Sequence, residues 1–397
     1  MSLAEISKKV KSIPPSATLA ISSNAKKMRA DGIDVVDFGV GEPDFDTPRH
    51  IKNAAKKAIN EGFTKYPPVS GIPELKAAIV EKFKRDNDLE YDTDQVVVSC
   101  GAKHVLYNIL QAICNPGDEV IVISPYWVSY TEMIKLADAK PSLVKTTAGN
   151  GFYPTPEQLN SAITPATKAI IINSPSNPTG AVYDKNTLKM IGEIACDNNI
   201  YIISDEIYEK LIYDGEVHYS IANLSKSIYE RTITVNGVSK AYAMTGWRIG
   251  YGAGPEQIIK AVGRIQSHST SGANSIAQRA ALEALTGPQD EVEKMRAQFE
   301  KRRNLVVDKL DEIENVSYTK PKGAFYVFLD VSANYGRTLN GKEINNSLDM
   351  ADYLITHAKV AVVPGKPFGY DDCIRLSFAT SMERIEEGLE RIKKALA

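Results

Sequence analysis

The feature that most constrains the fold is a regular alternation of short apolar runs with helical patterns between residues 95 and 251. The runs are rich in valine and isoleucine and are apolar throughout, which is typical of strands buried on both faces. Strands that alternate with helices build parallel sheets. We therefore expect an α/β fold, a mostly parallel sheet with helices on both faces. The expected strands are 95–99, 119–123, 168–173, 200–204, 231–235 and 248–251, with helices near 103–114 and 185–197.

The C-terminal third has a different pattern. From Val292 to Ile313, apolar residues recur at helical spacing in a long charged segment that can bridge two domains. Strand-like segments at 324–329 and 360–363 follow, and a helix near 385–396 ends the chain. This arrangement predicts a second, smaller α+β domain made from both chain ends. The expected division is residues 1–46 as an N-terminal arm and part of the small domain, 47–290 as the large domain, and 291–397 as the rest of the small domain.

Composition excludes several classes of protein. The chain has 397 residues, of which 43% are hydrophobic and 24% charged, so a disordered chain is excluded. Its 47 Lys and Arg against 49 Asp and Glu leave no basic excess for nucleic acid. No apolar run is long enough for a bilayer, and residues 1–11 lack the apolar stretch of a secretory signal. Four dispersed cysteines, at positions 100, 114, 196 and 373, indicate neither disulfides nor a metal site. We expect a cytoplasmic protein.

Polar residues follow the expected strands, where open α/β sheets bind ligands. Gly101, Ala102 and Lys103 open a helix whose N–H groups can bind an anion, although plain turns also have this pattern. Asn177 lies between two prolines, either as a hydrogen-bond donor or in an Asx-turn. Asp205 ends a strand, where its carboxylate either meets a cation or caps a helix.

Lys240 follows the strand at 231–235, with few charges nearby except Arg248. A desolvated amine near a cation has a lowered pKa and becomes nucleophilic toward carbonyls. Arg248 can hold a phosphate through two parallel hydrogen bonds. An amine, a carboxylate and phosphate donors together match the aldehyde, the ring nitrogen and the phosphate of pyridoxal 5'-phosphate.

These residues resemble a known family. Residues 237–250 fit the attachment-site signature of class I (fold type I) pyridoxal-phosphate-dependent aminotransferases, and so do 174–180, 204–208, 41–48 and 374–377. The likeness runs from about residue 15 to the C-terminus. It is strongest to the bacterial aspartate aminotransferase subgroup, which carries the motifs found here at 15–18 and 124–130.

The resemblance implies a role for each residue. Lys240 would hold the cofactor as an internal aldimine and then move the substrate's α-proton. Asp205 would face the pyridine nitrogen, while Asn177 and Tyr208 would hydrogen-bond the ring oxygen. Trp127 would stack on the cofactor ring and also lie beside the substrate, and Lys103 would lie beside the cofactor. The phosphate would be bound by Gly101, Ala102, Ser239, Arg248 and the neighbouring subunit's Tyr66. The substrate α-carboxylate would be bound by Arg375, Asn177 and Gly41. The family's active sites lie at the interface of a homodimer.

A dicarboxylic substrate also needs a cation near its distal carboxylate. In the subgroup, a lysine at the position of Lys103, aided by Ser16 and Thr18, does this. The loop expected at 265–273 lacks the arginine that another aspartate subgroup supplies there. We expect L-aspartate and 2-oxoglutarate as substrates, and an aromatic amino acid or prephenate as the alternative.

Other functions remain open on these residues. A carbon–sulfur lyase or a cyclopropane-forming synthase would use the same frame. A cofactor-free Schiff-base aldolase would leave Asp205 and Arg248 without roles. A regulator that senses an amino acid would need a DNA-binding segment, for which the chain lacks the length and the basic excess.

Overall fold

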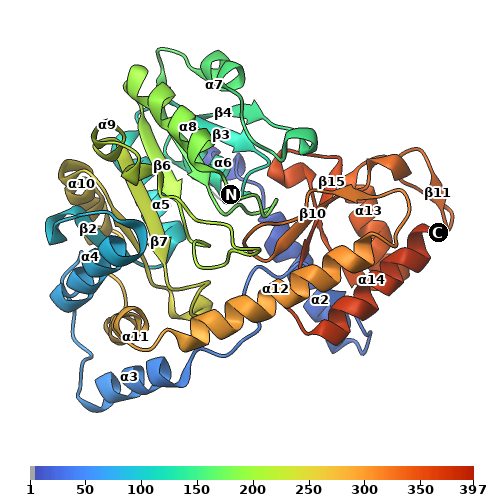
Figure 1. Ribbon diagram of the computed structural model, residues 1–397, viewed down its shortest axis with the longest axis horizontal. Helices are drawn as coiled ribbons and strands as arrows, with labels where there is room; N and C mark the ends of the chain where they lie inside the picture. The colour runs from blue at the N-terminus through green and yellow to red at the C-terminus, as the bar shows by residue number, and fades with distance from the viewer. Residues whose placement is uncertain (1–4) are drawn as a thin grey trace.

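A computed structural model describes residues 5–397, and a seven-stranded sheet forms its centre (Figure 1). The strand order is β2-β8-β7-β6-β5-β3-β4. In this sheet β8 alone runs opposite to the other six strands. The expected mostly parallel sheet is therefore confirmed. The strands are β2 (Val96–Ser99), β3 (Glu119–Ser124), β4 (Lys140–Lys145), β5 (Thr167–Asn173), β6 (Tyr201–Asp205), β7 (Thr232–Gly237) and β8 (Gly250–Ala253).

Helices cover both faces of this sheet. Successive strand residues point to opposite sides, so neighbouring residues of one strand pack against different helices. Val120 packs in one apolar cluster with α5 (Ala102–Ile113) and α10 (Glu256–Ser267). Ile121 packs in another cluster with α8 (Lys185–Asp197) on the other face. The other helices around the sheet are α3 (Arg49–Asn60), α4 (Pro73–Asn87), α6 (Ser129–Leu136), α7 (Pro156–Ala162), α9 (Lys226–Tyr229) and α11 (Ser275–Thr286).

A smaller antiparallel sheet has the order β14-β15-β10-β9. The N-terminal strand β1 (Val36–Asp37) pairs with β13 (Val360–Ala361), so both ends of the chain meet beside this sheet. The long helix α12 (Asp290–Leu310) runs from the large sheet toward it, next to α14 (Met382–Leu396) (Figure 1). The other elements are β9 (Ser317–Tyr318), β10 (Tyr326–Asp330), β14 (Val363–Pro364), β15 (Cys373–Ser377), the hairpin β11 (Thr338–Leu339) and β12 (Lys342–Glu343), and α13 (Ser347–Tyr353).

Several elements differ from what the sequence indicates. The N-terminal arm contains α1 (Lys8–Lys11) and a 14-residue helix, α2 (Ala17–Ala30), in which only Ala25 is buried. The apolar pattern of α2 is therefore weak. The edge strand β4 carries a proline, Pro141, which edge strands tolerate but which obscures the strand pattern. Helix α12 ends at Leu310, before the expected Ile313. No helix among residues 5–397 is both long and apolar enough to cross a bilayer.

Candidate active site

A cavity of about 410 Å³ lies beyond the carboxyl ends of β5, β6 and β7, where ligands of open α/β sheets bind. Two expected residues do not line it. Gly101 lies at its edge, directly before Ala102, and Tyr66 is 93% exposed elsewhere on the surface. The expected residues that do line it are Ser16, Thr18, Gly41, Ala102, Lys103, Trp127, Asn177, Asp205, Tyr208, Ser239, Lys240, Arg248 and Arg375.

The amino group of Lys240 lies on the cavity floor, three residues after β7. Its Nζ donates a hydrogen bond to the carbonyl of Gly41 at 2.6 Å and lies 5.8 Å from the ring centroid of Tyr208. Burial lowers its pKa to about 8, and Glu42 opposes the shift while Arg375 and Arg248 add to it. This amine can therefore exchange a proton near neutral pH.

The carboxylate of Asp205 is buried at the end of β6. Its Oδ2 accepts a hydrogen bond from the Tyr130 hydroxyl at 2.7 Å, and its Oδ1 accepts one from the Ile207 amide at 3.3 Å. Burial raises its pKa to about 6, against the effect of these two bonds. No ion pair among residues 5–397 includes Asp205. A buried carboxylate without a counter-charge is costly, so this group is suited to a cationic ligand.

Two glycines make room for an anion site at the start of α5. Gly101 has a left-handed φ of 93°, and a Cβ there would lie 2.4 Å from Nη2 of Arg248. A Cβ on Gly250 would lie 2.1 Å from the amide nitrogen of Ala102. These close approaches bring a guanidinium beside free N–H groups of the first helical turn, a suitable site for a phosphate.

The guanidinium of Arg375 is buried on β15. Its Nη2 donates to the carbonyl of Gly39 at 2.8 Å and its Nη1 to Oδ1 of Asn177 at 3.1 Å, while its Nε is buried without a partner. It lies over the Tyr326 ring at 4.4 Å, and burial lowers its pKa. Because its protein partners are neutral oxygens, it is left with a charge that a carboxylate can compensate.

The cavity lining holds a further cation. Lys103 Nζ lies 4.8 Å from the Trp127 ring centroid, and burial together with Arg248 lowers its pKa. The hydroxyls of Ser16 and Thr18 are 3.1 Å apart in the same cavity. The loop expected at 265–273 starts later than predicted, because residues 265–267 still belong to α10.

Four of the lining residues that have no role in the sequence interpretation form hydrogen bonds within the site. Tyr130 and Glu42 line the cavity and lie inside the family motifs at 124–130 and 41–48, so the resemblance offered a signal for both. Glu42 accepts a hydrogen bond from Thr245 at 2.6 Å. Tyr326, whose hydroxyl is 3.0 Å from that of Tyr208, and Asn173, which accepts from the Asn177 amide, carry no signal in the sequence.

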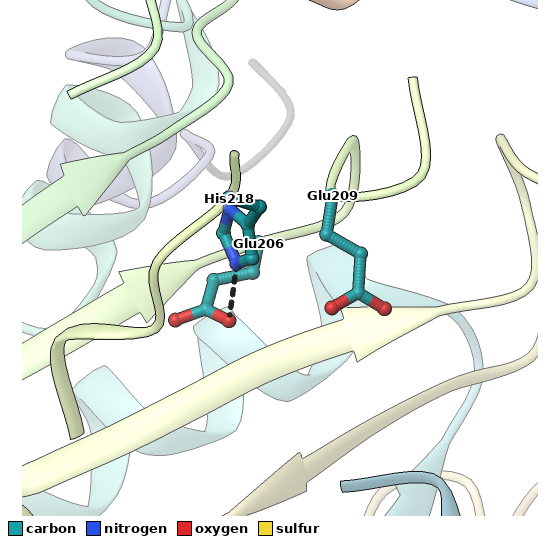
Figure 2. A group of neighbouring side chains, drawn as sticks. All are labelled: Glu206, Glu209 and His218. Carbon is teal, nitrogen blue, oxygen red and sulfur yellow. Dashed lines mark hydrogen bonds and ion pairs between the residues drawn. The ribbon is translucent and has the colours of Figure 1, made fainter. Parts of the chain in front are cut away.

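On the other side of β6, Glu206, Glu209 and His218 gather (Figure 2). His218 Nε2 lies 3.0 Å from one carboxylate oxygen of Glu206, and Ser204 and Ser220 donate to the other at 2.8 Å each. Glu209 pairs with the ammonium of Lys82 and accepts from Asn87. Protein donors and an ammonium thus satisfy these carboxylates, and we assign no metal here.

Comparison with known proteins agrees with this geometry. The family model for aminotransferases of class I and II matches residues 33–392. An aspartate aminotransferase of Bacillus sp. (strain YM-2) is 51% identical over 389 residues, 98% of each chain. An aspartate/prephenate aminotransferase of Cereibacter sphaeroides is 50% identical over 383 residues, 96% of each chain. The structure of the Rhizobium meliloti aspartate aminotransferase superposes with a TM-score of 0.96 at 44% identity and covers 99% of both chains.

Proposed function

The chain belongs to the class I and II aminotransferases, and from this premise we propose that it transfers the amino group of L-aspartate to 2-oxoglutarate, using pyridoxal 5'-phosphate held by Lys240. Relatives named aspartate aminotransferase, 50–51% identical over 98% of the chain, support the substrate. The observation that carries the proposal is the meeting of Lys240, Asp205 and Arg248 around one cavity.

The residues present fit this cofactor. Asp205 is a buried carboxylate without an ion-pair partner among residues 5–397, which suits a protonated ring nitrogen. The helix start at Ala102 and the guanidinium of Arg248 suit the phosphate, with Ser239 also lining the cavity. Lys240 offers an amine of lowered pKa for the aldehyde. When bound, pyridoxal phosphate supplies an aldehyde that exchanges amines and a ring that accepts electrons from the substrate's Cα.

The chain's own groups position the substrate and move its proton. Arg375 binds the α-carboxylate through its planar guanidinium and so fixes the orientation of the Cα–H bond. Lys240 Nζ takes up this proton and returns it, which its pKa of about 8 permits near neutral pH. Asn177 and Tyr208, which also line the cavity, would hydrogen-bond the ring oxygen of the cofactor, and Trp127 would stack on its ring.

The charge of the cavity favours a dicarboxylate. Its lining holds five cationic side chains, Lys26, Lys103, Lys240, Arg248 and Arg375, and two carboxylates, Glu42 and Asp205. This positive excess suits a phosphate together with a doubly charged substrate. We assign the distal carboxylate to Lys103, Ser16 and Thr18. The aspartate/prephenate name of the Cereibacter relative favours prephenate, another dicarboxylate, as a second substrate.

We further infer a cytoplasmic homodimer in which Tyr66 contacts the phosphate bound by the neighbouring subunit. Tyr66 is 93% exposed and does not line the cavity of its own chain, which supports a role outside its own site. Mixing inactive Lys240→Ala chains with Tyr66→Phe chains, in which phosphate binding should be weakened, tests this inference at limiting cofactor. If each active site uses Lys240 of one subunit and Tyr66 of the other, a hybrid dimer contains one active site with neither substitution. Activity should then be partly restored.

The visible spectrum of the holoenzyme tests the proposed function. Adding L-aspartate should bleach the yellow absorbance, and adding 2-oxoglutarate should restore it, with oxaloacetate and glutamate as products. Borohydride should fix the cofactor to the peptide that contains Lys240. Ammonia and an oxo acid formed without an acceptor would indicate a lyase instead, and faster bleaching by phenylalanine would replace aspartate as the substrate.

A further inference from the structure

The backbone of residues 37–41 contacts two of the cationic side chains of the site, Arg375 and Lys240. The carbonyl of Gly39 accepts a hydrogen bond from Nη2 of Arg375 at 2.8 Å, and that of Gly41 accepts one from Nζ of Lys240 at 2.6 Å. The position of this segment therefore determines where the two side chains rest in the cavity.

A buried carboxylate, Asp37, holds this segment. Its side chain is only 3% exposed. Its Oδ1 accepts from the Gly39 amide at 2.9 Å, and its Oδ2 accepts from Nη2 of Arg29 at 3.2 Å. Burial raises the pKa of Asp37, while the Gly39 amide and Arg29 act in the opposite direction. Burying a carboxylate costs free energy, which its hydrogen-bond and ion-pair partners must compensate. Asp37 therefore does more at this position than fill space in an apolar interior.

Arg29 belongs to a helix, α2, that contributes other residues to the cavity wall. It lies in the last turn of α2, and residues of the same helix, Thr18, Ser22 and Lys26, line the cavity. The helix also packs closely on the segment, since a Cβ on Gly39 would lie 3.1 Å from Cγ2 of Ile21. One carboxylate thus joins the helix that faces the distal end of a substrate to the backbone that contacts Arg375.

We propose that Asp37 is a positioning residue that, through Arg29, couples the placement of α2 to that of the Arg375 guanidinium, so that both ends of a dicarboxylate are bound together. This inference rests on the proposed function, because it assigns the α-carboxylate to Arg375 and the distal carboxylate to the wall that α2 helps to form. Neither Asp37 nor Arg29 lines the cavity. The coupling therefore predicts that substitutions of these two residues change substrate binding without touching the substrate.

Steady-state kinetics of the holoenzyme variants test the coupling. Arg29→Ala should raise KM for aspartate about fivefold, the scale of a partly exposed ion pair, with kcat within about twofold. Arg29→Lys should restore most of the loss, because it keeps the charge. Asp37→Asn should resemble Arg29→Ala, whereas Asp37→Ala should also lower kcat, because the Gly39 amide loses its acceptor and Arg375 is misplaced. Lys27→Ala, on the same helix, is the matched control and should behave as wild type.

Two further measurements separate positioning from lost stability. The inhibition constant of succinate, a dicarboxylate that cannot react, should rise with KM in Arg29→Ala, and the Arg29→Ala/Asp37→Ala double variant should be no worse than Asp37→Ala. Additive effects, an unchanged inhibition constant or an equal effect of Lys27→Ala would overturn the coupling. Wild-type enzyme inactive on aspartate would instead refute the proposed function. If Asp37→Ala does not fold, Arg29→Ala, Arg29→Lys and Lys27→Ala still decide the question.

Discussion

The hydroxyl of Tyr130 donates a hydrogen bond to Oδ2 of Asp205 across 2.7 Å, although 75 residues separate the two in the sequence. Both side chains are buried. Burial favours the neutral form of Asp205, and the Tyr130 bond favours the ionised form. Tyr130 therefore helps to keep a negative charge where the cofactor's ring nitrogen is proposed to bind.

The first prediction concerns this bond. Tyr130→Phe should lower kcat about tenfold, because hydrogen bonds to charged groups contribute roughly 1.5–3 kcal/mol. Asp205→Asn, which removes the charge itself, should cost on the order of a hundredfold. Tyr107→Phe, on the neighbouring helix α5, is the control and should leave kcat unchanged. Wild-type kcat in Tyr130→Phe would show that the bond has no catalytic effect.

The second prediction distinguishes the two lysines of the cavity. Lys240→Ala should lose at least about four orders of magnitude in transamination, since nucleophile and proton carrier are removed together. Lys103→Ala should still be labelled at Lys240 when borohydride is added with pyridoxal phosphate. Peptide mapping by mass spectrometry reads the site. If the reduced cofactor were found on Lys103 of the wild type, Lys103 would be the attachment site instead of Lys240.

The third prediction is a pH dependence of stability in the cofactor-free protein. The pKa of Asp205 is raised from 3.8 to about 6 in the folded chain. Below about pH 3, the carboxyl is protonated in both states, so Asp205→Asn should change the unfolding free energy little. As pH rises toward 6, only the unfolded chain ionises, and the wild type should lose on the order of 3 kcal/mol relative to the variant.

Urea unfolding of both proteins from pH 3 to 8 measures this difference, which should become constant above about pH 7. Bound pyridoxal phosphate should remove it, because a cation beside Asp205 stabilises the ionised form. A difference that does not change with pH would contradict the raised pKa.

The fourth prediction concerns the α-carboxylate. Arg375→Lys should raise KM and lower kcat together, because an ammonium cannot form two parallel hydrogen bonds to a carboxylate. The buried Tyr326 ring would also lose its planar partner. Arg279→Lys, a surface arginine paired with Glu74, is the control. A rise in KM alone would mean that Arg375 binds the substrate without orienting it.

Much of this site could be predicted because its residues directly follow strands. Asp205 ends β6, and Lys240 follows β7 by three residues, so the sheet rule places both at one edge. The family resemblance then supplied partners that local patterns do not reveal, such as Arg375 on a strand of the other sheet.

The missed residues depend on packing between distant segments. Tyr130 and Asp37 matter through hydrogen bonds to Asp205 and Gly39, and nothing in their local sequence reports those bonds. Helix α2 was missed because a helix with one buried residue has little apolar periodicity. The domain boundaries at residues 46 and 290 stay predictions.

The last prediction addresses the substrate. The Lys103 ammonium lies over the Trp127 ring, 4.8 Å from its centroid, and burial together with Arg248 lowers its pKa. Lys103→Met keeps a side chain of similar length and removes the charge. This variant should lose roughly 10- to 100-fold in kcat/KM for aspartate, the value of one charge-assisted hydrogen bond, and change less than about threefold for phenylalanine. Lys57→Met, at an exposed position on α3, is the matched control. Equal losses for aspartate and phenylalanine would mean that Lys103 supports the cofactor rather than the distal carboxylate.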